Sequence, residues 1–408
     1  MTLDLQYVRS QFPSLAGGWT FFDNAGGSQT ARPVIDRLTD YLCTSNVQLG
    51  ATYAPSLTAG ERVLSATEQV ATLVNAEYAS EVVMGSSTTM LLRILSLGLA
   101  RYLAPGDEVI VTNCDHEANI GPWIALADRG VTVKTWSLNR ESYRLQTEEL
   151  QRLMTDRTRL VAVPHVSNIL GTINPIREIA DMVHERGAWI CVDGVAFAPH
   201  RLVDVRELDV DFYAYSFYKV YGPHQAVLYG KREHMLAIPG WNHFFFDESS
   251  LPAKFQPGGV NYELTASLGG IGDYLQGVAS AHQVQETELR SASRQVFSLI
   301  ADHEQTLSKQ LLDFLDSKPK VRVIGDLRPA ADFRVPTMSF VIDGTHSGSI
   351  PPEIDKQRIG IRYGHFYAKR LIDDLGLAER GGVVRVSMVH YNTLEEVDRL
   401  TAALDPLI

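Results

Sequence analysis

Short apolar runs alternate with amphipathic stretches along the first 265 residues. The apolar runs predict buried strands at 81–84, 108–112, 131–136, 159–163 and 188–192. The spacing of apolar positions between them predicts helices near 118–128, from Thr147 onward and over 175–186. Short strands separated by helices are typical of an α/β fold with a doubly wound, mostly parallel sheet.

The pattern changes after about residue 265. A long helical stretch near 262–316 is followed by apolar runs at 321–324, 337–342 and 383–388, and Thr393 with Glu396 forms a capping box that opens a last helix. These elements predict a small α+β domain. We therefore expect a large domain over 15–280 and a small C-terminal domain over 281–408, joined by an N-terminal arm at 1–14.

Composition narrows the classes of function. The 408 residues carry 37 Lys and Arg against 48 Asp and Glu, a net charge of −11, which argues against a nucleic-acid partner. We see no secretory signal, no apolar run that could span a bilayer and no spacing typical of a metal site. The three cysteines are unclustered, so we expect a reducing, cytoplasmic location without disulfides or a bound metal.

Lys219 lies between an apolar strand that begins at Asp211 and the turn Gly222-Pro223. Burying an ammonium group is costly unless it is paired or neutralised. A desolvated lysine with a depressed pKa is, however, a nucleophile that forms a Schiff base with a carbonyl. Taken alone, Lys219 fits a surface lysine at a strand end better than a catalytic one.

Asp193 gives the lysine a chemical partner. It ends the apolar run 188–192, and ligands of open α/β sheets bind outside the carboxyl ends of strands. An acid and a lysine at neighbouring strand ends match the needs of pyridoxal phosphate, which requires a lysine for its aldehyde and an acid that keeps its ring nitrogen protonated.

The sequence resembles the class V aminotransferase-like group of fold-type I pyridoxal-phosphate enzymes, and within it the cysteine desulfurases, over nearly the whole chain. The matching segments are Asp115–Asn119, Val166–Pro175, Val192–Gly194, Ser216–Pro223 and Val384–Thr393. The resemblance implies a catalytic Lys219 that carries the cofactor, a catalytic Asp193 at the ring nitrogen, and a catalytic His116 stacked on the cofactor ring.

The resemblance also implies further roles in binding the cofactor and the amino-acid substrate. The cofactor residues would be Ser87 and Thr88 at the phosphate, together with Asn168, Ser216 and Tyr218. The substrate residues would be Asn24, Arg362, His365 and Arg385, with Arg385 at the substrate carboxylate. Hydroxyls at a helix start are also ordinary caps, and a buried arginine can serve a structural ion pair.

The chain departs from the desulfurase pattern in four places. Tyr367 stands where the loop after Arg362 would carry the sulfur-accepting cysteine, and a phenol cannot form a persulfide. Ala196 replaces a glutamine, Tyr218 replaces a histidine, and the segment 257–261 lacks a phosphate-binding threonine. Lysine and acid remain, so the cofactor is expected while the specificity is altered.

Three hypotheses about the function remain open at this point. The first is a cysteine desulfurase-like enzyme that binds its amino acid as an external aldimine and acts as a C–S lyase by β-elimination. The second is a class V aminotransferase or an amino-acid epimerase. The third is a degenerate, non-catalytic binding protein of the same fold. The family counterpart of 258–261 reaches into a neighbouring subunit, so we also expect a homodimer, with no membrane or nucleic-acid partner.

Overall fold

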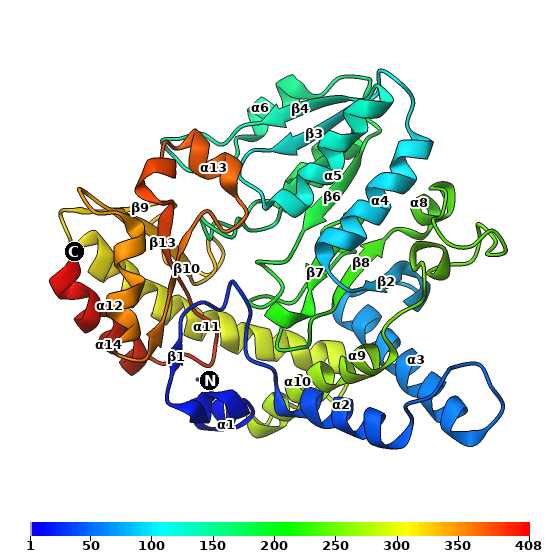
Figure 1. Ribbon diagram of the computed structural model, residues 1–408, viewed down its shortest axis with the longest axis horizontal. Helices are drawn as coiled ribbons and strands as arrows, with labels where there is room; N and C mark the ends of the chain where they lie inside the picture. The colour runs from blue at the N-terminus through cyan, green and yellow to red at the C-terminus, as the bar shows by residue number, and fades with distance from the viewer. Residues whose placement is uncertain (1) are drawn as a thin grey trace.

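A seven-stranded sheet organises the chain in the computed structural model, which describes residues 2–408 (Figure 1). Its strand order is β2-β8-β7-β6-β5-β3-β4. The strands are β2 Val82–Gly85, β3 Glu108–Thr112, β4 Thr132–Trp136, β5 Thr158–Pro164, β6 Trp189–Asp193, β7 Phe212–Ser216 and β8 Ala226–Gly230. The five strands from β7 to β4 are parallel, and β8 is antiparallel to both of its neighbours.

Helices cover both faces of this sheet. The helices described in the chain are α1 Leu5–Ser10, α2 Arg32–Thr44, α3 Ala54–Val74, α4 Thr88–Tyr102, α5 Gly121–Ile124, α6 Thr147–Leu153, α7 Ile176–His184, α8 Arg232–Ala237, α9 Tyr262–Ser267, α10 Gly269–Ala281, α11 Leu289–Asp316, α12 Pro351–Asp355, α13 Lys369–Asp374 and α14 Leu394–Leu404. One face of the large sheet packs against α3, α7, α10 and α11, and the other against α4, α5 and α8. Helices α12 and α14 pack against the small C-terminal sheet instead.

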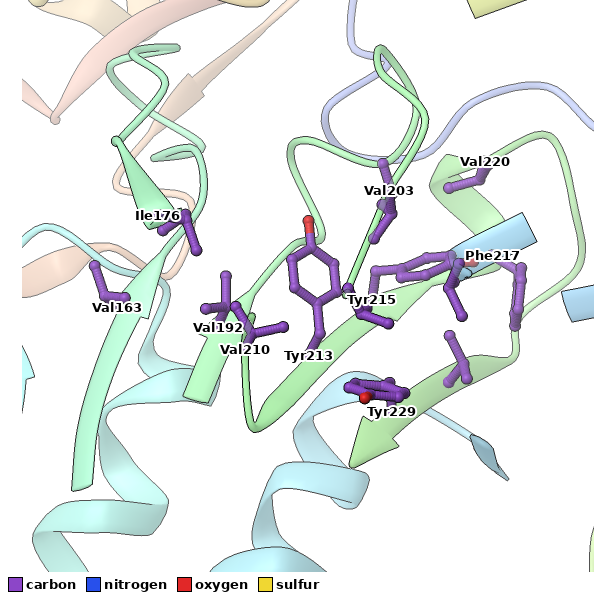
Figure 2. Packing of buried hydrophobic residues seen from close by; sticks show 14 of the residues in the cluster. Val163, Ile176, Val192, Val203, Val210, Tyr213, Tyr215, Phe217, Val220 and Tyr229 are labelled. Carbon is purple, nitrogen blue, oxygen red and sulfur yellow. The ribbon is translucent and has the colours of Figure 1, made fainter. Parts of the chain in front are cut away.

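The central strands are buried on both sides because alternate residues enter two separate cores, whereas in the edge strand β4 only Trp136 is buried. In β7, Tyr213 and Tyr215 belong to the first core, whereas Phe212 and Ala214 belong to the second. Figure 2 shows Val163, Val192 and Tyr213 from three successive strands of the sheet within the first core. Burial on both faces explains why the strands read as continuous apolar runs rather than as alternating ones.

A second, four-stranded antiparallel sheet lies in the C-terminal part, in the order β12-β13-β10-β9. Its strands are β9 Val321–Val323, β10 Thr337–Ile342, β12 Arg362–Gly364 and β13 Val383–Ser387. A separate two-stranded pair joins β1 Thr20–Phe21 to β11 Ile359–Gly360. Helix α11 runs from the large sheet to this C-terminal part, as Figure 1 shows. The predicted fold class is confirmed, with a mixed large sheet and a small antiparallel one.

Two predicted helices differ from the observed ones. The stretch 118–128 holds only the one-turn α5 between two 3-10 turns, because Ile120 leaves helical geometry and Pro122 lacks a donor. The stretch 262–316 is three helices rather than one. Its longest break follows α10, where Gln283 adopts a left-handed φ of 56° and Glu288 caps the next helix. The predicted capping box of Thr393 and Glu396 is present at the start of α14.

Candidate active site

The carboxyl ends of four neighbouring parallel strands bring the predicted chemistry to one edge of the sheet. His116 follows β3, Asn168 follows β5, Asp193 ends β6, and Lys219 lies one short turn after β7. These strands are adjacent in the order β7-β6-β5-β3 and run parallel, so their carboxyl ends meet at the same rim.

A cavity of about 480 Å³ opens at this rim. All eight of the residues expected to bind the cofactor line it: Ser87, Thr88, His116, Asn168, Asp193, Ser216, Tyr218 and Lys219. The cavity is also lined by Asp115 and Ala196. Residues that are up to 132 positions apart in the sequence, from Ser87 to Lys219, therefore line the same cavity.

Lys219 is buried at this site, with 7% of its surface exposed. Burial, with the positive charge of Arg385 as a second cause, lowers the pKa of its amine to about 8. Carboxylates at Asp193 and Asp23 act in the opposite direction and keep the pKa from falling further. The amine is therefore partly neutral near neutral pH, which is the form that attacks a carbonyl.

Asp193 and Asp115 form a pair of buried carboxyl groups. Burial raises the pKa of Asp193 to about 6, while the Val195 amide, which donates to Oδ1 at 2.8 Å, and Lys219 oppose that shift. Burial and the charge of Asp193 raise the pKa of Asp115. Asp115 accepts from the backbone of His116 and from the side chain of Asn119, both at 2.7 Å. The sequence analysis named Asp115 only as part of the segment Asp115–Asn119 and gave it no role in the site. Its position just after β3 could have indicated that it lies at the same edge of the sheet as Asp193.

His116 is held as a neutral ring. Its Nδ1 accepts from the Ala118 amide at 3.0 Å, which leaves the proton on Nε2. Burial, followed by the charges of Lys219 and Arg385, lowers its pKa to about 4. The ring of Tyr367 lies on it with a centroid separation of 5.2 Å and an interplanar angle of 36°. A neutral ring beside the cavity can stack on a flat ligand without adding charge.

Hydroxyl groups at the start of α4 form the part of the cavity suited to an anion. Ser87 is the N-cap and accepts from the Met90 amide at 3.2 Å, so its side chain does serve the helix. Thr88 is buried, and its hydroxyl lies 2.7 Å from that of Ser216. The unpaired backbone N–H groups and the dipole of a helix start favour a phosphate at such a place.

The expected substrate residues lie beside the cavity rather than in its lining. Arg385 donates from Nη2 to Oδ1 of Asp23 at 3.0 Å and from Nη1 to the Asn168 carbonyl at 3.2 Å. Arg362 approaches the other oxygen of Asp23 at 3.4 Å. Asp23 and Arg362 line a neighbouring cavity of about 860 Å³, which shares Tyr218 with the first one.

Asn24 and His365 have other surroundings. Asn24 is buried, its amide donates to two carbonyls and to Asn392, and Tyr391 donates to its oxygen. The donors and the acceptor of the Asn24 side chain are therefore all paired within the protein, which indicates a structural role. His365 is exposed and accepts from the Tyr367 amide at 3.1 Å through Nδ1. Neither residue lines the cavity, and their substrate roles stay predictions.

The three cysteines are all free. Cys43 is exposed on α2, and Cys114 and Cys191 are buried. Burial, with the carboxylate of Asp115 as a second cause, raises the pKa of Cys114 to about 12, and its thiol donates to the hydroxyl of Thr112. Burial likewise raises the pKa of Cys191. None of the three lines the cavity.

Comparisons with known proteins agree with this geometry. The model of the aminotransferase class-V family matches residues 20–400, and the chain belongs to that family. The chain is 43% identical to the aminotransferase-like protein FGM3 of Gibberella zeae over 416 residues, covering 100% of this chain and 99% of the relative. It is 36% identical to the cysteine desulfurase-like protein ustD of Aspergillus flavus, covering 100% and 91%.

The fold is also that of solved cysteine desulfurases. The crystal structure of the desulfurase CsdA from Escherichia coli superimposes with a TM-score of 0.83 at 26% identity, covering 100% of this chain and 98% of the other. The chain is therefore a cysteine desulfurase-like member of the class V aminotransferases, a family that normally uses pyridoxal phosphate.

The cavity fits that cofactor. The Oδ1 atom of Asn168 is buried without a hydrogen-bond partner, whereas its amide donates to the Phe366 carbonyl at 2.8 Å. An unpaired buried acceptor at a cavity wall indicates a ligand that donates to it. Lys219 for an aldehyde, Asp193 for a ring nitrogen, and Thr88 with Ser216 for a phosphate complete a suitable set of groups.

The described residues 2–408 offer neither a metal centre nor a membrane-spanning helix. No group of three or more His, Cys, Asp or Glu side chains in this range could hold a metal ion. None of the helices described in it combines the length and the apolar character needed to cross a membrane.

Proposed function

We propose that this protein is a pyridoxal-phosphate-dependent enzyme that removes a substituent from the β-carbon of an amino acid, with C–S cleavage of cysteine or cystine as the first candidate reaction. The observation that carries the proposal is the burial of Lys219 and Asp193 in one cavity, where the amine has a pKa of about 8. When bound, the cofactor withdraws electrons from the α-carbon of an amino acid.

The residues of the chain divide the remaining tasks. Lys219 would hold the cofactor through Nζ and would take the α-proton of the substrate on the same atom. Asp193 supplies the carboxylate for the ring nitrogen, and His116 supplies a neutral ring to stack on. Thr88 and Ser216 bind the phosphate, and Arg385 binds the substrate carboxylate.

The missing thiol supports release of the β-substituent as a free product. A desulfurase needs a thiolate that can reach the substrate sulfur, and thiolate character requires a low pKa. By the resemblance to the desulfurases, Tyr367 stands where that thiol would be, and 67% of its surface is exposed. Cys114 is the nearest thiol in sequence to His116, but its pKa of about 12 keeps it protonated. β-Elimination from cysteine needs no such thiol, because cysteine and water yield pyruvate, ammonia and sulfide.

The test is product analysis with a panel of amino acids. Purified protein loaded with pyridoxal phosphate is incubated with cysteine, cystine and other amino acids, and pyruvate, sulfide and keto acids are measured. We expect pyruvate and sulfide from cysteine, or pyruvate and free cysteine persulfide from cystine, and we expect alkylation of the thiols to leave this turnover largely intact. Formation of alanine together with a persulfide on the protein would show that the protein is a cysteine desulfurase. A keto acid without sulfide or free persulfide, or an inverted α-carbon, would instead indicate an aminotransferase or an epimerase.

The cofactor assignment is tested separately at the lysine. Lys219→Ala should abolish the visible absorbance that borohydride bleaches, whereas Lys309→Ala, which changes an exposed lysine paired with Asp313 on α11, should not. A borohydride-reducible adduct in the Lys219 variant would contradict the site. A wild-type protein that takes up no cofactor would favour a non-catalytic binding protein of the same fold.

We also propose a homodimer whose subunits meet near the turn Gly258–Asn261. Both glycines of that turn have left-handed φ values near 80°, and the turn lines an apolar cavity that reaches Gly85 and Ser86 beside the helix start of α4. Light scattering should show twice the mass of the chain. A monomer at all concentrations would contradict this proposal.

A further inference from the structure

The buried guanidinium of Arg385 lies over the face of the Phe366 ring. The guanidinium carbon is 3.7 Å from the ring centroid, and only 8% of Phe366 and 1% of Arg385 are exposed. A cation over an aromatic face is attracted by the ring, and the attraction grows when water is excluded. Phe366 therefore fixes the plane in which the guanidinium lies.

The donors in that plane are only partly used. Nη1 donates to the Asn168 carbonyl and Nη2 to Asp23, but Nε is buried without a partner. A buried charged group that leaves a donor unpaired is costly, and a carboxylate binds the planar edge of an arginine through two parallel hydrogen bonds. The free donor on Arg385 is thus a place for a carboxylate that the protein itself does not fill.

The backbone that presents the ring is strained and firmly held. Phe366 and Tyr367 have φ values of 47° and 60°, a left-handed conformation that is strained for residues other than glycine. The Asn168 side chain donates to the Phe366 carbonyl at 2.8 Å, and the Glu117 amide donates to the Tyr367 carbonyl at 2.9 Å. Strain that surrounding contacts maintain is typical of functional segments.

The same contacts link the ring to the cavity. Asn168 lines the cavity and is bonded to Phe366 through its side chain and to Arg385 through its carbonyl. The charge of Arg385 also reaches Lys219 and His116, because it lowers the pKa of both. The stacked pair therefore stands within electrostatic reach of the reacting groups.

We propose that Phe366 is a positioning residue that holds the guanidinium of Arg385 ready for the substrate carboxylate, and so sets the preference for substrates that carry one. The inference rests on the proposed function, since it assigns a task at the same site. Without the aromatic face, Arg385 keeps its two edge contacts but loses the surface that fixes its plane. A less ordered guanidinium binds a carboxylate less well because ordering it then opposes binding.

The experiment compares two amines that react with lysine-bound pyridoxal phosphate, aminooxyacetate and methoxyamine. Both are aminooxy compounds, but only the first carries a carboxylate. The rate constant of each is measured from the change in visible absorbance of the holoenzyme, and the ratio of the two reports recognition of the carboxylate. The ratio needs no knowledge of the natural substrate.

Phe366→Leu retains apolar volume without an aromatic face, and we expect it to lower the ratio about tenfold, within the range of a buried cation–aromatic contact. Phe366→Tyr should keep most of the wild-type ratio, which a purely space-filling role would not require. Arg385→Gln should bring the ratio close to that of the two reagents with free cofactor. The reaction with methoxyamine should change little in the Phe366 variants.

Tyr363→Leu is the matched control. Tyr363 is an aromatic residue of β12, the strand beside β13, and packs near His346. It pairs with Val384 while its neighbour Arg362 pairs with Arg385, so the side chain of Tyr363 points to the opposite face of the sheet from Arg385. Its replacement should leave the ratio unchanged. An unchanged ratio in Phe366→Leu, or equal losses in the Leu and Tyr variants, would overturn the inference while leaving the proposed function intact. A wild-type protein that reacts with neither amine would overturn both.

Discussion

Asp23 and Arg385 form an ion pair beside the cavity, with Nη2 of the arginine 3.0 Å from Oδ1 of the aspartate. The two residues are separated by 362 positions and come from the loop after β1 and from the middle of β13. Their charges act on Lys219 in opposite directions: Arg385 lowers the pKa of the lysine and Asp23 raises it. Burial is the largest cause of the lowered pKa of Lys219, and the ion pair adjusts how much of the amine is neutral at a given pH.

The neutral amine of Lys219 should form with a midpoint near pH 8 rather than near 10.5. Its folded pKa lies below its ordinary value, so the reactive neutral form grows as the pH rises through about 8. We expect the initial rate at which the apoprotein captures pyridoxal phosphate, fixed by borohydride and measured by peptide mass spectrometry at Lys219, to follow that titration. Exposed Lys309 offers an internal comparison. A Lys219 midpoint above pH 10 would contradict a desolvated amine.

Substitutions of the ion pair should move this midpoint in opposite directions. Asp23→Asn removes a charge that raises the pKa of Lys219, so the midpoint should fall, and Arg385→Gln removes one that lowers it, so the midpoint should rise. The same capture assay measures both. Shifts of the same sign would show that the variants act by disturbing the fold rather than through charge.

Thr88 and Ser216 should contribute to affinity for the phosphate group alone. Their hydroxyls are 2.7 Å apart at the start of α4. Thr88→Val retains the shape of the side chain without the hydroxyl, and we expect it to weaken retention of pyridoxal phosphate about tenfold, the value of one hydrogen bond to a charged group. Binding of pyridoxal, which lacks the phosphate, should be nearly unchanged. Equal losses for the two ligands, measured by fluorescence titration of the apoprotein, would assign Thr88 to packing.

The strand-end residues of the site were predictable because each follows an apolar run. Asp193 and Lys219 both come after such runs, and parallel strands bring their carboxyl ends together whatever the connecting helices do. Strand β8 was not predicted, because it returns antiparallel through a short link after Lys219 instead of following a helix. The prediction of a helix over 118–128 was wrong for a local reason, because the helix is interrupted at Ile120 and Pro122.

The contacts of Arg385 could not be predicted in the same way. Its position in an apolar strand indicated an anionic partner, but the partner Asp23 lies near the other end of the chain. The ring of Phe366 reaches the guanidinium only because two successive residues adopt left-handed φ values. Neither feature leaves a periodic pattern in the sequence. Local periodicity therefore predicted the elements and the strand ends, whereas the packing around the site depends on long-range contacts.

Two buried histidines should make the fold sensitive to mild acid. Burial lowers the pKa of His165 to about 3 and that of His390 to about 3. Their folded pKa values lie below the unfolded value, so their stabilising effect is complete above about pH 6.5 and is lost as the pH falls toward 3. At pH 5 each should cost about 2 kcal/mol of unfolding free energy relative to pH 7.

His165→Gln separates this effect from packing. The ring stacks on Phe197 at 3.5 Å and bonds the Tyr213 hydroxyl at 2.9 Å, so the variant should be less stable at pH 7. It should nevertheless lose less stability than the wild type between pH 7 and pH 5. Urea unfolding at the two pH values measures both quantities. An equal loss in variant and wild type would contradict a neutral His165.

Gly194 follows Asp193 directly and lies under the ring of Tyr213. A Cβ added at Gly194 would meet the Tyr213 ring atom Cε1 at 2.0 Å. Tyr213 is 1% exposed within the first core, and its hydroxyl bonds His165, so the ring has no room to yield. The absence of a side chain at Gly194 thus allows β6 to end with Asp193 in the cavity wall.

Gly194→Ala should therefore destabilise the protein by about 3 kcal/mol or more, as expected for overpacking a rigid core, and should weaken cofactor binding by displacing Asp193. Urea unfolding gives the first quantity, and titration of the apoprotein with pyridoxal phosphate gives the second.

Gly60→Ala is the matched control, because Gly60 lies within α3 with no atom within 4 Å of the added carbon. It should stabilise the protein by roughly 0.5–1 kcal/mol through helix propensity and leave binding unchanged. Adding Tyr213→Leu to Gly194→Ala should recover part of the lost stability, because it removes the ring that the new methyl group meets. Full stability and full binding in Gly194→Ala would show that the strand end can shift without moving Asp193, and would contradict the packing described for this wall of the cavity.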